Sequence, residues 1–470
     1  MRGRRAVPKA VVQALSYERC PAKTWQSKSG ETRLGRSVPE HCEIVGNVAK
    51  QLIALYPPQL AAKLFPVGSP LAAASHDVGK VSPTFVAKLV DACTHCPLWA
   101  KEWAIEHSIE TQWGGHAGVS QLAAIAVSLP KFIPEILGQH HGFTPPVSSY
   151  RADDSVLGGT AWQQERHKLF DELRTRLRMQ WPTIESDAQA RLVAGLTCVA
   201  DWIGSGAFFE DPAKPWQPNI QKALDDAGWH RPAYRSKLSF DDVFGFSPRP
   251  AQQQLVGAVQ GSGVYVLEAS MGIGKTEAAL YAAYRQLQAG HACGIYFALP
   301  TQLTSNKIYD RFNKFLGKIL KDDSPFHSRL LHSGAWLLDT AMGEEGEPGR
   351  SWFSSAKRGL LAPFAVGTLD QALMAAMNVK HGSVRALGLA GKVVILDEVH
   401  TYDAYTSTLL DDLINLLRQL QCTVIILSAT LSQNRRMQLL QAPLHNQDYP
   451  LITAIANDCA PQELLSLIHI

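Results

Sequence analysis

The sequence predicts a multidomain protein in which an all-α domain is followed by an α/β domain built on a parallel sheet. Three observations predict this order. Apolar residues recur at helical spacing over residues 42–56 and 188–208, in a half where strand-like alternation is scarce. Beyond about residue 235, short apolar runs alternate with helical stretches, which is typical of βαβ units. A strand, a loop with two glycines and a helix follow one another over Val264–Leu280.

Length and composition bound the class of protein. The 470 residues allow two or three domains, and the net charge of +3 is compatible with nucleic-acid binding without indicating it. We expect no signal peptide, because no apolar stretch follows the basic N-terminus, and no membrane span, because no apolar run approaches the roughly 18 residues that a span needs. The eight cysteines are scattered, which favours free thiols in a reducing cytoplasm. Cys93 and Cys96 have the spacing of zinc ligands, but a lone pair of this kind is more often incidental.

The helical half contains an ordered series of histidines and aspartates. They are His41, His76, Asp77, His116, His140, His141 and Asp201. Neutral imidazoles and carboxylates are the ligands that divalent Mn, Fe, Co, Ni and Zn prefer. A carboxylate next to a histidine can bridge two ions, and ions ~3.5–4 Å apart can activate water and hold a phosphodiester during displacement. Any one of these histidines alone is better explained as a core or surface residue, whereas the whole series favours a metal site.

This series resembles the HD-type nuclease domain, and more narrowly the version found in the CRISPR-associated helicase–nuclease of type I systems. The motifs that carry the resemblance are SHDVGK at 75–80, GGHAGVS at 114–120, GQHHG at 138–142 and ADWIGS at 200–205. The family implies two metal ions, one held by His41, His76, Asp77 and Asp201 and the other by Asp77, His116, His140 and His141. It also implies that Asp77 and Lys80 are catalytic, with Lys80 near the scissile phosphate. The alternative for Lys80 is a solvated surface lysine.

Five apolar runs in the second half predict parallel strands, at residues 264–267, 295–298, 364–366, 393–396 and 424–427. Each run ends in a polar signature, and the carboxyl ends of parallel strands open on one crevice. We therefore expect the five signatures to meet there.

Two of these signatures predict a nucleoside triphosphate site. In the first, Gly272 and Gly274 let the backbone approach phosphates, Lys275 reaches the β- and γ-phosphates, and the Thr276 hydroxyl can bind Mg²⁺. In the fourth, Asp397 can hold Mg²⁺ and Glu398 can orient and deprotonate the attacking water. The alternatives are a glycine-rich turn without chemistry and a pair of acids that caps the next helix.

The second half resembles the first RecA-like domain of superfamily 2 DEAD/DEAH-like helicases. The motifs are RPAQ at 249–252, MGIGKTEAAL at 271–280, LPTQLTSN at 299–306, VGTLDQ at 366–371, DEVH at 397–400 and SAT at 428–430. The family implies that Gln252 reads adenine and that Ser428 and Thr430 couple hydrolysis to domain movement. It implies a groove for a nucleic-acid strand formed by Pro300, Thr301, Gln302, Gly367, Thr368 and Gln371.

We expect an HD-type nuclease domain at 1–215, a linker at 216–245, the first RecA-like ATPase domain at 246–445 and a truncated tail at 446–470. No second sheet and no Q-R-x-G-R-type helix follow SAT, so we expect the second RecA-like domain to be absent. Motors of this kind use an arginine finger worth ~10³-fold or more in rate. The chain alone is therefore expected to bind ATP weakly, to hydrolyse it poorly and not to unwind DNA.

The two family resemblances together imply metal-dependent endonuclease or exonuclease cleavage of single-stranded DNA, coupled to an ATP-dependent helicase, in CRISPR-associated antiviral defence. The expected cofactors are ATP, Mg²⁺ at the ATP site and two divalent ions (Mn²⁺, Co²⁺, Ni²⁺ or Fe²⁺) at the HD site. The expected partners are single-stranded DNA and an RNA-guided, Cascade-type surveillance complex, and no membrane. Two alternatives stay open: an HD phosphohydrolase of small nucleotides with a regulatory P-loop module, and an inactive truncated relic that only binds nucleotide.

Overall fold

The computed structural model describes residues 14–27, 29–97, 107, 110–111, 114–145, 147, 154–322, 329–331, 353, 358–377, 379–399, 404–446, 448–457 and 461–465. His400 of the DEVH motif and the last residues of the expected tail, 466–470, lie outside the described residues. The chain divides into two compact units, Met1–Ile53 with Phe65–Trp229 and Ala54–Leu64 with His230–Ile470. Of the helices in these ranges, none combines the length and apolarity needed to cross a membrane.

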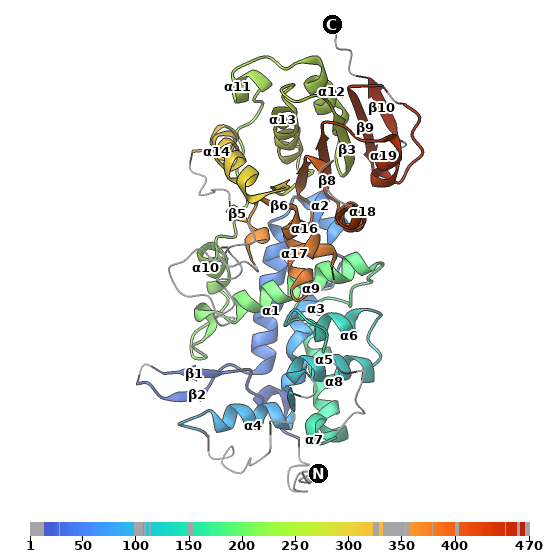
Figure 1. The fold of residues 1–470 in the computed structure, drawn as a ribbon. Coiled ribbons are helices and arrows are strands. Elements are labelled where there is room, and N and C mark those ends of the chain that lie inside the picture. The colour runs from blue at the N-terminus through green and yellow to red at the C-terminus, as the bar shows by residue number, and fades with distance from the viewer. Residues whose placement is uncertain are drawn as a thin grey trace. The chain divides into compact units, whose positions relative to one another are not determined.

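The first unit is helical, as the sequence predicts (Figure 1). Its helices are α1 (Val38–Ala54), α3 (Ser69–Ala74), α4 (Pro83–Asp91), α5 (Gly115–Ala126), α6 (Ile133–Gly138), α7 (Asp154–Leu157), α8 (Gly159–Leu177), α9 (Asp187–Gly204) and α10 (Asn219–Asp226), with a 3₁₀ helix at Ser75–Lys80. The apolar stripe of α1 faces the core, since Ile44, Val48 and Leu52 are at most 2% exposed. Two short antiparallel strands, β1 (Thr24–Gln26) and β2 (Thr32–Leu34), depart from the all-α expectation.

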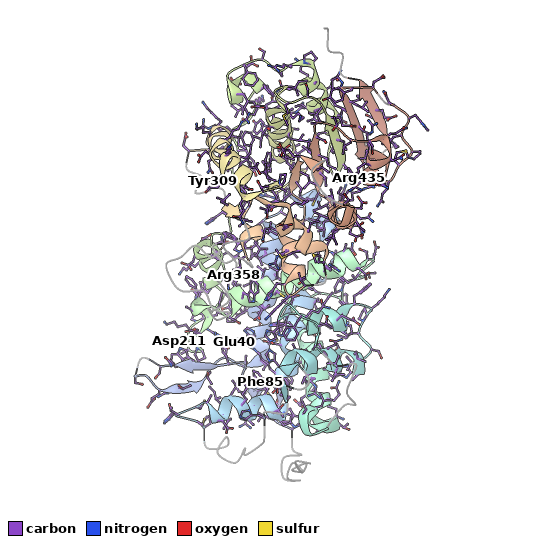
Figure 2. The ribbon with its side chains drawn as sticks, viewed as in Figure 1. Glu40, Phe85, Asp211, Tyr309, Arg358 and Arg435 are labelled. Carbon is purple, nitrogen blue, oxygen red and sulfur yellow. The ribbon has the colours of Figure 1, made fainter. Side chains whose placement is uncertain are left out.

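A buried arginine fixes the start of α1. Arg36 forms an ion pair with Glu40 and donates hydrogen bonds to the backbone carbonyls of Phe209 and Asp211, each at 2.6 Å (Glu40 and Asp211 are labelled in Figure 2). A buried guanidinium is tolerated because its donors are satisfied in this way. These hydrogen bonds connect the residues just before α1 to the segment after α9. They therefore fix the first turn of α1, which carries His41.

The second unit contains an eight-stranded sheet of order β10-β9-β3-β8-β7-β4-β6-β5 (Figure 1). The strands are β3 (Gly263–Glu268), β4 (Ile295–Leu299), β5 (Arg329–Leu331), β6 (Phe364–Thr368), β7 (Val393–Asp397), β8 (Thr423–Ser428), β9 (Leu451–Ala456) and β10 (Gln462–Leu465). Neighbours from β3 to β5 in this order are parallel, whereas β9 and β10 pair antiparallel. All five predicted strands are present, and the prediction of a mostly parallel α/β unit is confirmed.

The segment interpreted from sequence as a truncated tail, residues 446–470, contributes two strands to this sheet. β9 pairs with β3 from Leu451 opposite Glu268 to Ala456 opposite Gly263. Its residues are apolar or β-branched and almost all buried, so the run covers the edge of β3. The sequence interpretation missed these strands because no catalytic motif marks them.

Helices pack on the sheet around one apolar core. Buried residues of α11 (Phe240–Phe244), α12 (Pro250–Ala258), α13 (Lys275–Gln288) and α14 (Gln302–Ile319) join alternate strand residues such as Tyr265, Leu267 and Ile295. The other helices are α16 (Leu369–Ala376), α17 (Gly382–Leu389), α18 (Ala404–Gln419) and α19 (Gln433–Leu440). The expected linker at 216–245 contains α10, which belongs to the first unit, and α11, which belongs to the second.

A segment from the N-terminal part of the sequence belongs to the second unit. Helix α2 (Pro58–Leu64) lies within Ala54–Leu64, which clusters with His230–Ile470. Arg231 donates to the carbonyl of Tyr56 at 2.5 Å, and a Cβ placed on Gly391 would lie 2.7 Å from Leu60 Cδ2 and 3.2 Å from Leu64 Cδ1. The sequence expectation had assigned this segment to a domain at 1–215, since local periodicity does not reveal which core a short helix joins.

We predict that Leu64→Ala destabilises the second unit selectively. Leu64 is 1% exposed, and truncation of a buried leucine costs about 2–5 kcal/mol. Hydrogen exchange of the β7 and β8 amides should accelerate in this variant. The matched control is Leu52→Ala in α1, which should leave β7 and β8 unchanged. Faster exchange confined to the first unit in Leu64→Ala would contradict the assignment of α2.

Candidate functional site

The seven predicted ligands come together in the first unit. They form two groups, His116, His140 and His141 in one and His41, His76, Asp77 and Asp201 in the other, and within each group the ligand atoms lie within 4.8 Å of one another. Separate elements supply them: α1, the 3₁₀ helix, α5, the turn after α6, and the last part of α9. The sequence therefore predicted a cluster that the fold assembles from segments far apart in the chain.

Asp77 lies between the two groups. Its Oδ2 is 3.0 Å from His41 Nε2 and 3.1 Å from His76 Nε2, while its Oδ1 is 3.3 Å from His116 Nε2 and 3.5 Å from His140 Nε2. A carboxylate with one oxygen toward each group has the geometry of a bridging ligand. This position makes Asp77 common to both groups.

The arrangement of the polar atoms fits divalent ions. His41 Nε2 and His76 Nε2 are buried and face the Asp77 carboxylate, and neither makes a hydrogen bond of regular geometry among the described residues. His76 Nδ1 lies 2.8 Å from the Ala73 carbonyl and His140 Nδ1 lies 2.7 Å from the Leu137 carbonyl. A carbonyl can only accept, so Nδ1 of each ring keeps its proton, and Nε2 is the nitrogen that faces the cluster and could bind a metal ion.

Burial and charge set the protonation of the cluster. Burial lowers the pKa of His116 to about 4 and, together with His141, holds the pKa of His140 well below its ordinary value. Burial disfavours the charged forms of Asp77 and Asp201, but the pKa of each stays well below its usual range, chiefly because of His76. Burial would also lower the pKa of His76, yet these two carboxylates outweigh it and raise the pKa to about 10. The buried carboxylates thus require cationic partners, a role that divalent ions would fill.

Lys80 lies in the same cluster. Its Nζ is 2.6 Å from Asp77 Oδ2 and its side chain is 12% exposed, so it is not a solvated surface lysine. Burial alone would lower the pKa of Lys80, but Asp77 and Asp201 raise it, which keeps the ammonium charged. The Nζ also lies 5.4 Å from the ring centroid of Phe85 (labelled in Figure 2), and this ring packs edge-on against His116.

Further residues position the ligands. Ser205 Oγ donates to Asp201 Oδ1 at 2.9 Å, and the Gly79 N–H donates to Ser120 Oγ at 2.8 Å. A Cβ on Gly79 would lie 2.1 Å from the His116 carbonyl, so only glycine permits this approach of α5. The site residues named from sequence did not include these three, although each stands inside a quoted motif, which was the signal available.

Cys93 and Cys96 are free thiols. The Cys96 Sγ donates to the Val90 carbonyl at 3.3 Å, and neither thiol belongs to a group of three potential ligands within the described residues. The zinc alternative stays a prediction.

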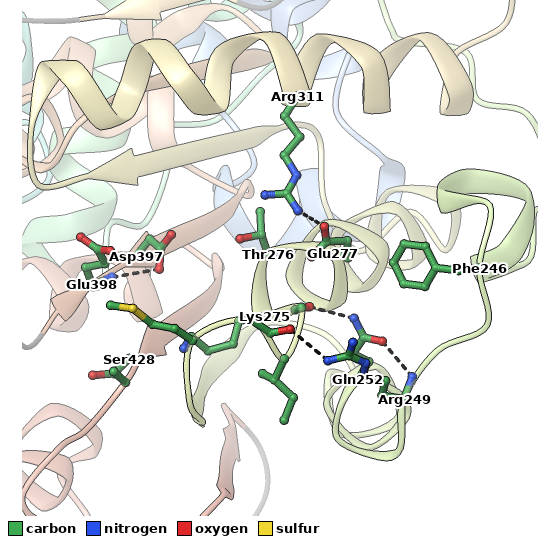
Figure 3. Close-up of a pocket in the computed structure, with 15 residues that line it drawn as sticks. Phe246, Arg249, Gln252, Lys275, Thr276, Glu277, Arg311, Asp397, Glu398 and Ser428 are labelled. Atoms are coloured by element: carbon green, nitrogen blue, oxygen red, sulfur yellow. Dashed lines mark hydrogen bonds and ion pairs between the residues drawn. The ribbon is translucent and has the colours of Figure 1, made fainter.

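In the second unit, the predicted phosphate loop lines a pocket (Figure 3). The lining residues are Phe246, Arg249, Gln252, Met271, Gly272, Ile273, Gly274, Lys275, Thr276, Glu277, Arg311, Asp397, Glu398, Ser428 and Ala429. They come from the ends of β3, β7 and β8, from the starts of α12 and α13, and from α14. Three of the five polar signatures therefore line one pocket, whereas those at 300–302 and 367–371 are not among its lining residues.

Backbone geometry shapes the phosphate loop. Gly272 and Gly274 have φ of +81° and +87°, values that L side chains rarely adopt. Lys275 Nζ donates to the Ala269 carbonyl at 2.5 Å and to the Ser270 carbonyl at 3.2 Å, contacts that phosphate oxygens can replace. Burial lowers the pKa of Lys275, and Asp397 offsets part of this effect.

Hydrogen bonds hold the side chains of Gln252 and Asp397 near the phosphate loop. Gln252 Oε1 accepts from the Arg249 N–H at 2.8 Å and its Nε2 donates to the Gly274 carbonyl at 2.9 Å. An amide group retains a second lone pair and a second N–H, so Gln252 can still bind a base edge. Asp397 Oδ1 accepts from the Glu398 N–H at 3.0 Å, and Glu398 has a φ of +54°.

The residues assigned by resemblance to a strand groove differ in accessibility. Thr301 and Gln302 are exposed at the start of α14, where Thr301 caps the helix. Thr368 and Gln371 are 3% and 6% exposed, and a Cβ on Gly367 would lie 2.5 Å from the Leu331 carbonyl. Gly367, Thr368 and Gln371 are therefore buried, and Pro300 is half-buried.

The coupling segment is tied to the phosphate loop. Ser428 Oγ donates to the Thr430 carbonyl at 3.0 Å, and the Leu431 N–H donates to Glu268 Oε1 at 3.1 Å. Glu268, the residue before the loop, also forms a buried ion pair with Arg436 at 2.8 Å. Sequence reasoning missed this pair, because an apolar strand gives no sign that its last residue finds a partner in a distant helix.

Family models match both units. Residues 22–209 match a model described as the Cas3 HD domain and residues 249–438 match the DEAD/DEAH box helicase model. A CRISPR-associated endonuclease/helicase Cas3 of Thermus thermophilus is 35% identical over 417 residues, which cover 78% of this chain and 44% of that protein. The chain belongs to the Cas3 family. A Cas3 nuclease/helicase of Streptococcus thermophilus is 30% identical and covers 78% of this chain and 46% of its own length, so the chain spans less than half of these relatives.

Solved Cas3 structures share the fold. A T. fusca Cas3 crystal structure with AMPPNP superposes with a TM-score of 0.74 at 26% identity, over 96% of this chain and 56% of that one. A CRISPR RNA-guided surveillance complex in a pre-nicking state contains a chain that matches with a TM-score of 0.65 at 25% identity, over 96% and 54%. The family resemblance inferred from the motifs is confirmed.

Glu110, a buried glutamate of the first unit, predicts that the folding stability of the protein depends on pH. Glu110 is 5% exposed, one of its carboxylate oxygens has no partner among the described residues, and burial raises its pKa from 4.5 to about 7. Between these pH values the folded chain holds a proton that the unfolded chain has lost, so stability falls as pH rises through this interval. The loss is of the order of 3 kcal/mol and is complete above pH 7.

Glu110→Gln should abolish this slope and be the more stable form above pH 7. The measurement is thermal unfolding of both proteins from pH 4 to 8, with the exposed Glu135→Gln as the matched control. Parallel pH profiles for wild type and Glu110→Gln would contradict the prediction.

The bridging position of Asp77 predicts the stoichiometry of metal binding. The wild-type chain should bind two Mn²⁺ ions in calorimetric titration, His141→Ala should retain one, and Asp77→Asn should retain neither. The control is His167→Ala, an exposed histidine paired with Asp171 on α8. Binding of two ions by Asp77→Asn would exclude a bridging carboxylate.

Proposed function

We propose that this protein is a metal-dependent nuclease for single-stranded DNA joined to an ATP-dependent DNA helicase domain, and that it acts in CRISPR-associated antiviral defence. The observation that carries the nuclease is the buried cluster in which Asp77 has one oxygen toward each ligand group. Family membership supports the same activity, since the relatives are described as nuclease/helicases.

In the nuclease unit, His41, His76, Asp77 and Asp201 would hold one divalent ion and Asp77, His116, His140 and His141 the second. Such ions, of which Mn²⁺, Co²⁺, Ni²⁺ and Fe²⁺ suit this mixed donor set, supply Lewis-acid activation of water and of the phosphodiester. The neutral Nε2 atoms of His116 and His140 suit metal binding at neutral pH because burial keeps these rings unprotonated. The Lys80 ammonium remains charged beside Asp77 and would bind a phosphate oxygen and stabilise negative charge that develops there.

In the second unit, Lys275 and the amides of the phosphate loop would bind the β- and γ-phosphates of ATP, and Gln252 the adenine. Thr276 and Asp397 would hold Mg²⁺, and Glu398 would take the proton of the attacking water. Thr301 and Gln302, with the half-buried Pro300, would line the path of the DNA strand, and Gly367, Thr368 and Gln371, which are buried here, would reach it only after a rearrangement. Ser428 and Thr430 would couple hydrolysis to movement, since Ser428 is bonded to the Thr430 carbonyl and the next residue, Leu431, is bonded to Glu268.

Membership of the Cas3 family also suggests a partner. A relative is part of a CRISPR RNA-guided surveillance complex, so a complex of that class would recruit this protein in the cytoplasm. A phosphohydrolase of small nucleotides would have no use for a strand path, and it is retained only as an outcome of the test.

The two units should be separable by mutation. With Mn²⁺ and labelled single-stranded DNA, Asp77→Ala should cut at least ~10²-fold more slowly, since changes to outer-shell residues alone cost 10–100-fold. Lys275→Ala should cut as wild type without ATP but bind a fluorescent ATP analogue at least ~10-fold more weakly, because it loses a charge-assisted hydrogen bond. Each variant serves as the control for the other. Hydrolysis of free nucleotides by the wild type, with DNA left intact, would overturn the nuclease in favour of a phosphohydrolase.

A further inference from the structure

The loop that follows the double histidine exposes an aromatic side chain. Phe143 is 42% exposed, and of the described residues in the first unit only Val67, Ile125 and Phe208 are other large apolar side chains with comparable exposure. Single exposed apolar residues are common on protein surfaces. This one follows His141 by two residues, however, so its Cα lies within about 7 Å of the Cα of a candidate ligand.

Hydrogen bonds hold this loop in one conformation. The Gly142 N–H donates to the Gln139 carbonyl at 2.7 Å, and Gln139 Nε2 donates to Thr144 Oγ1 at 3.2 Å. Gly142 has a φ of +80°, which allows the sharp turn directly after the histidines. Gly142 and Pro145 are buried, whereas Phe143 and Thr144 between them are exposed. The buried flanks anchor the loop and direct its middle outward.

The backbone that carries Phe143 is therefore tied to the turn that carries His140 and His141. His140 is held by its Nδ1 contact to the Leu137 carbonyl, and His141 Nε2 lies 3.1 Å from His116 Nε2. A phosphodiester bound at these imidazoles would bring the base of a neighbouring nucleotide to Phe143. Bases stack on aromatic rings with little sequence preference, and each such contact changes affinity by about 5- to 150-fold.

We propose that Phe143 is a base-stacking residue of the nuclease site, which sets the register of the strand by holding the base next to the phosphate to be cut. The inference rests on the proposed cleavage of single-stranded DNA. A strand with a base at that position should be cut efficiently, whereas a strand that lacks the base should slip or bind weakly.

The test maps Mn²⁺-dependent cleavage of end-labelled oligothymidines, each ~20 nucleotides long and carrying one abasic site at a successive position. In the wild type, an abasic site at one fixed distance from a phosphate should lower kcat/KM for cleavage there by about 5- to 150-fold, mainly through KM. Phe143→Ala should cut the intact oligonucleotide less well by a similar factor and show no dependence on the abasic position. Phe143→Trp should restore the wild-type pattern.

Phe208, the other exposed phenylalanine among the described residues of this unit, supplies the matched control: Phe208→Ala should behave as the wild type. Thermal unfolding of each variant establishes that the fold is retained. If Phe143→Ala keeps the wild-type rate and the wild-type abasic pattern, the stacking role is wrong while the nuclease proposal stands. If the wild type cuts no oligonucleotide at all, the proposed function fails first and the stacking role with it.

Discussion

The carboxylate of Asp77 is the interaction on which the first unit depends. It is 1% exposed and lies within 3.5 Å of four imidazoles and one ammonium group. A buried carboxylate is costly unless it is paired in good geometry, so the elements that supply its partners must be placed accurately. The Arg36 bonds at the start of α1, the close approach at Gly79 and the Ser205 bond to Asp201 all serve that placement. Helices with ordinary apolar stripes form the scaffold, and the polar centre determines how they are arranged.

In the second unit the corresponding constraint is the register of parallel strands. β3 and β8 pair residue by residue up to Glu268 and Ser428, which brings the phosphate loop and the SAT segment to the same edge of the sheet. β7 ends beside them with Asp397 opposite Leu427. The buried pair of Glu268 and Arg436 then fixes the loop after β8 against the strand before the phosphate loop. The pocket is thus a consequence of strand pairing, and the candidate nucleotide-binding residues lie at the last paired positions or directly after them.

Much of this could be predicted from the sequence, for physical reasons. Short apolar runs followed by polar signatures identified all five strands that carry motifs. This worked because parallel strands that are buried on both faces consist almost entirely of apolar residues. The series of histidines and aspartates predicted the cluster that the structure shows, because such a series of candidate ligands seldom arises by chance. The features that could not be predicted from the sequence are those that depend on tertiary packing. Nothing local assigns α2 to the second core, β9 carries no chemistry, and the burial of Thr368 and Gln371 depends on neighbours such as Tyr296, whose hydroxyl donates to the Thr368 carbonyl at 2.7 Å. Glu110 also escaped notice, since an isolated glutamate predicts solvent exposure.

The place of α2 has a consequence for how the chain folds as it is synthesised. The ribosome releases residues 54–64 long before β7 and β8, yet Leu60 and Leu64 pack against Gly391 at the start of β7. The helices on either side of this segment in sequence belong to a unit that can close early. An apolar helix must therefore remain exposed, or be shielded by a chaperone, until the later strands leave the exit tunnel. Translation speed between these points would decide how long that surface is at risk of aggregation.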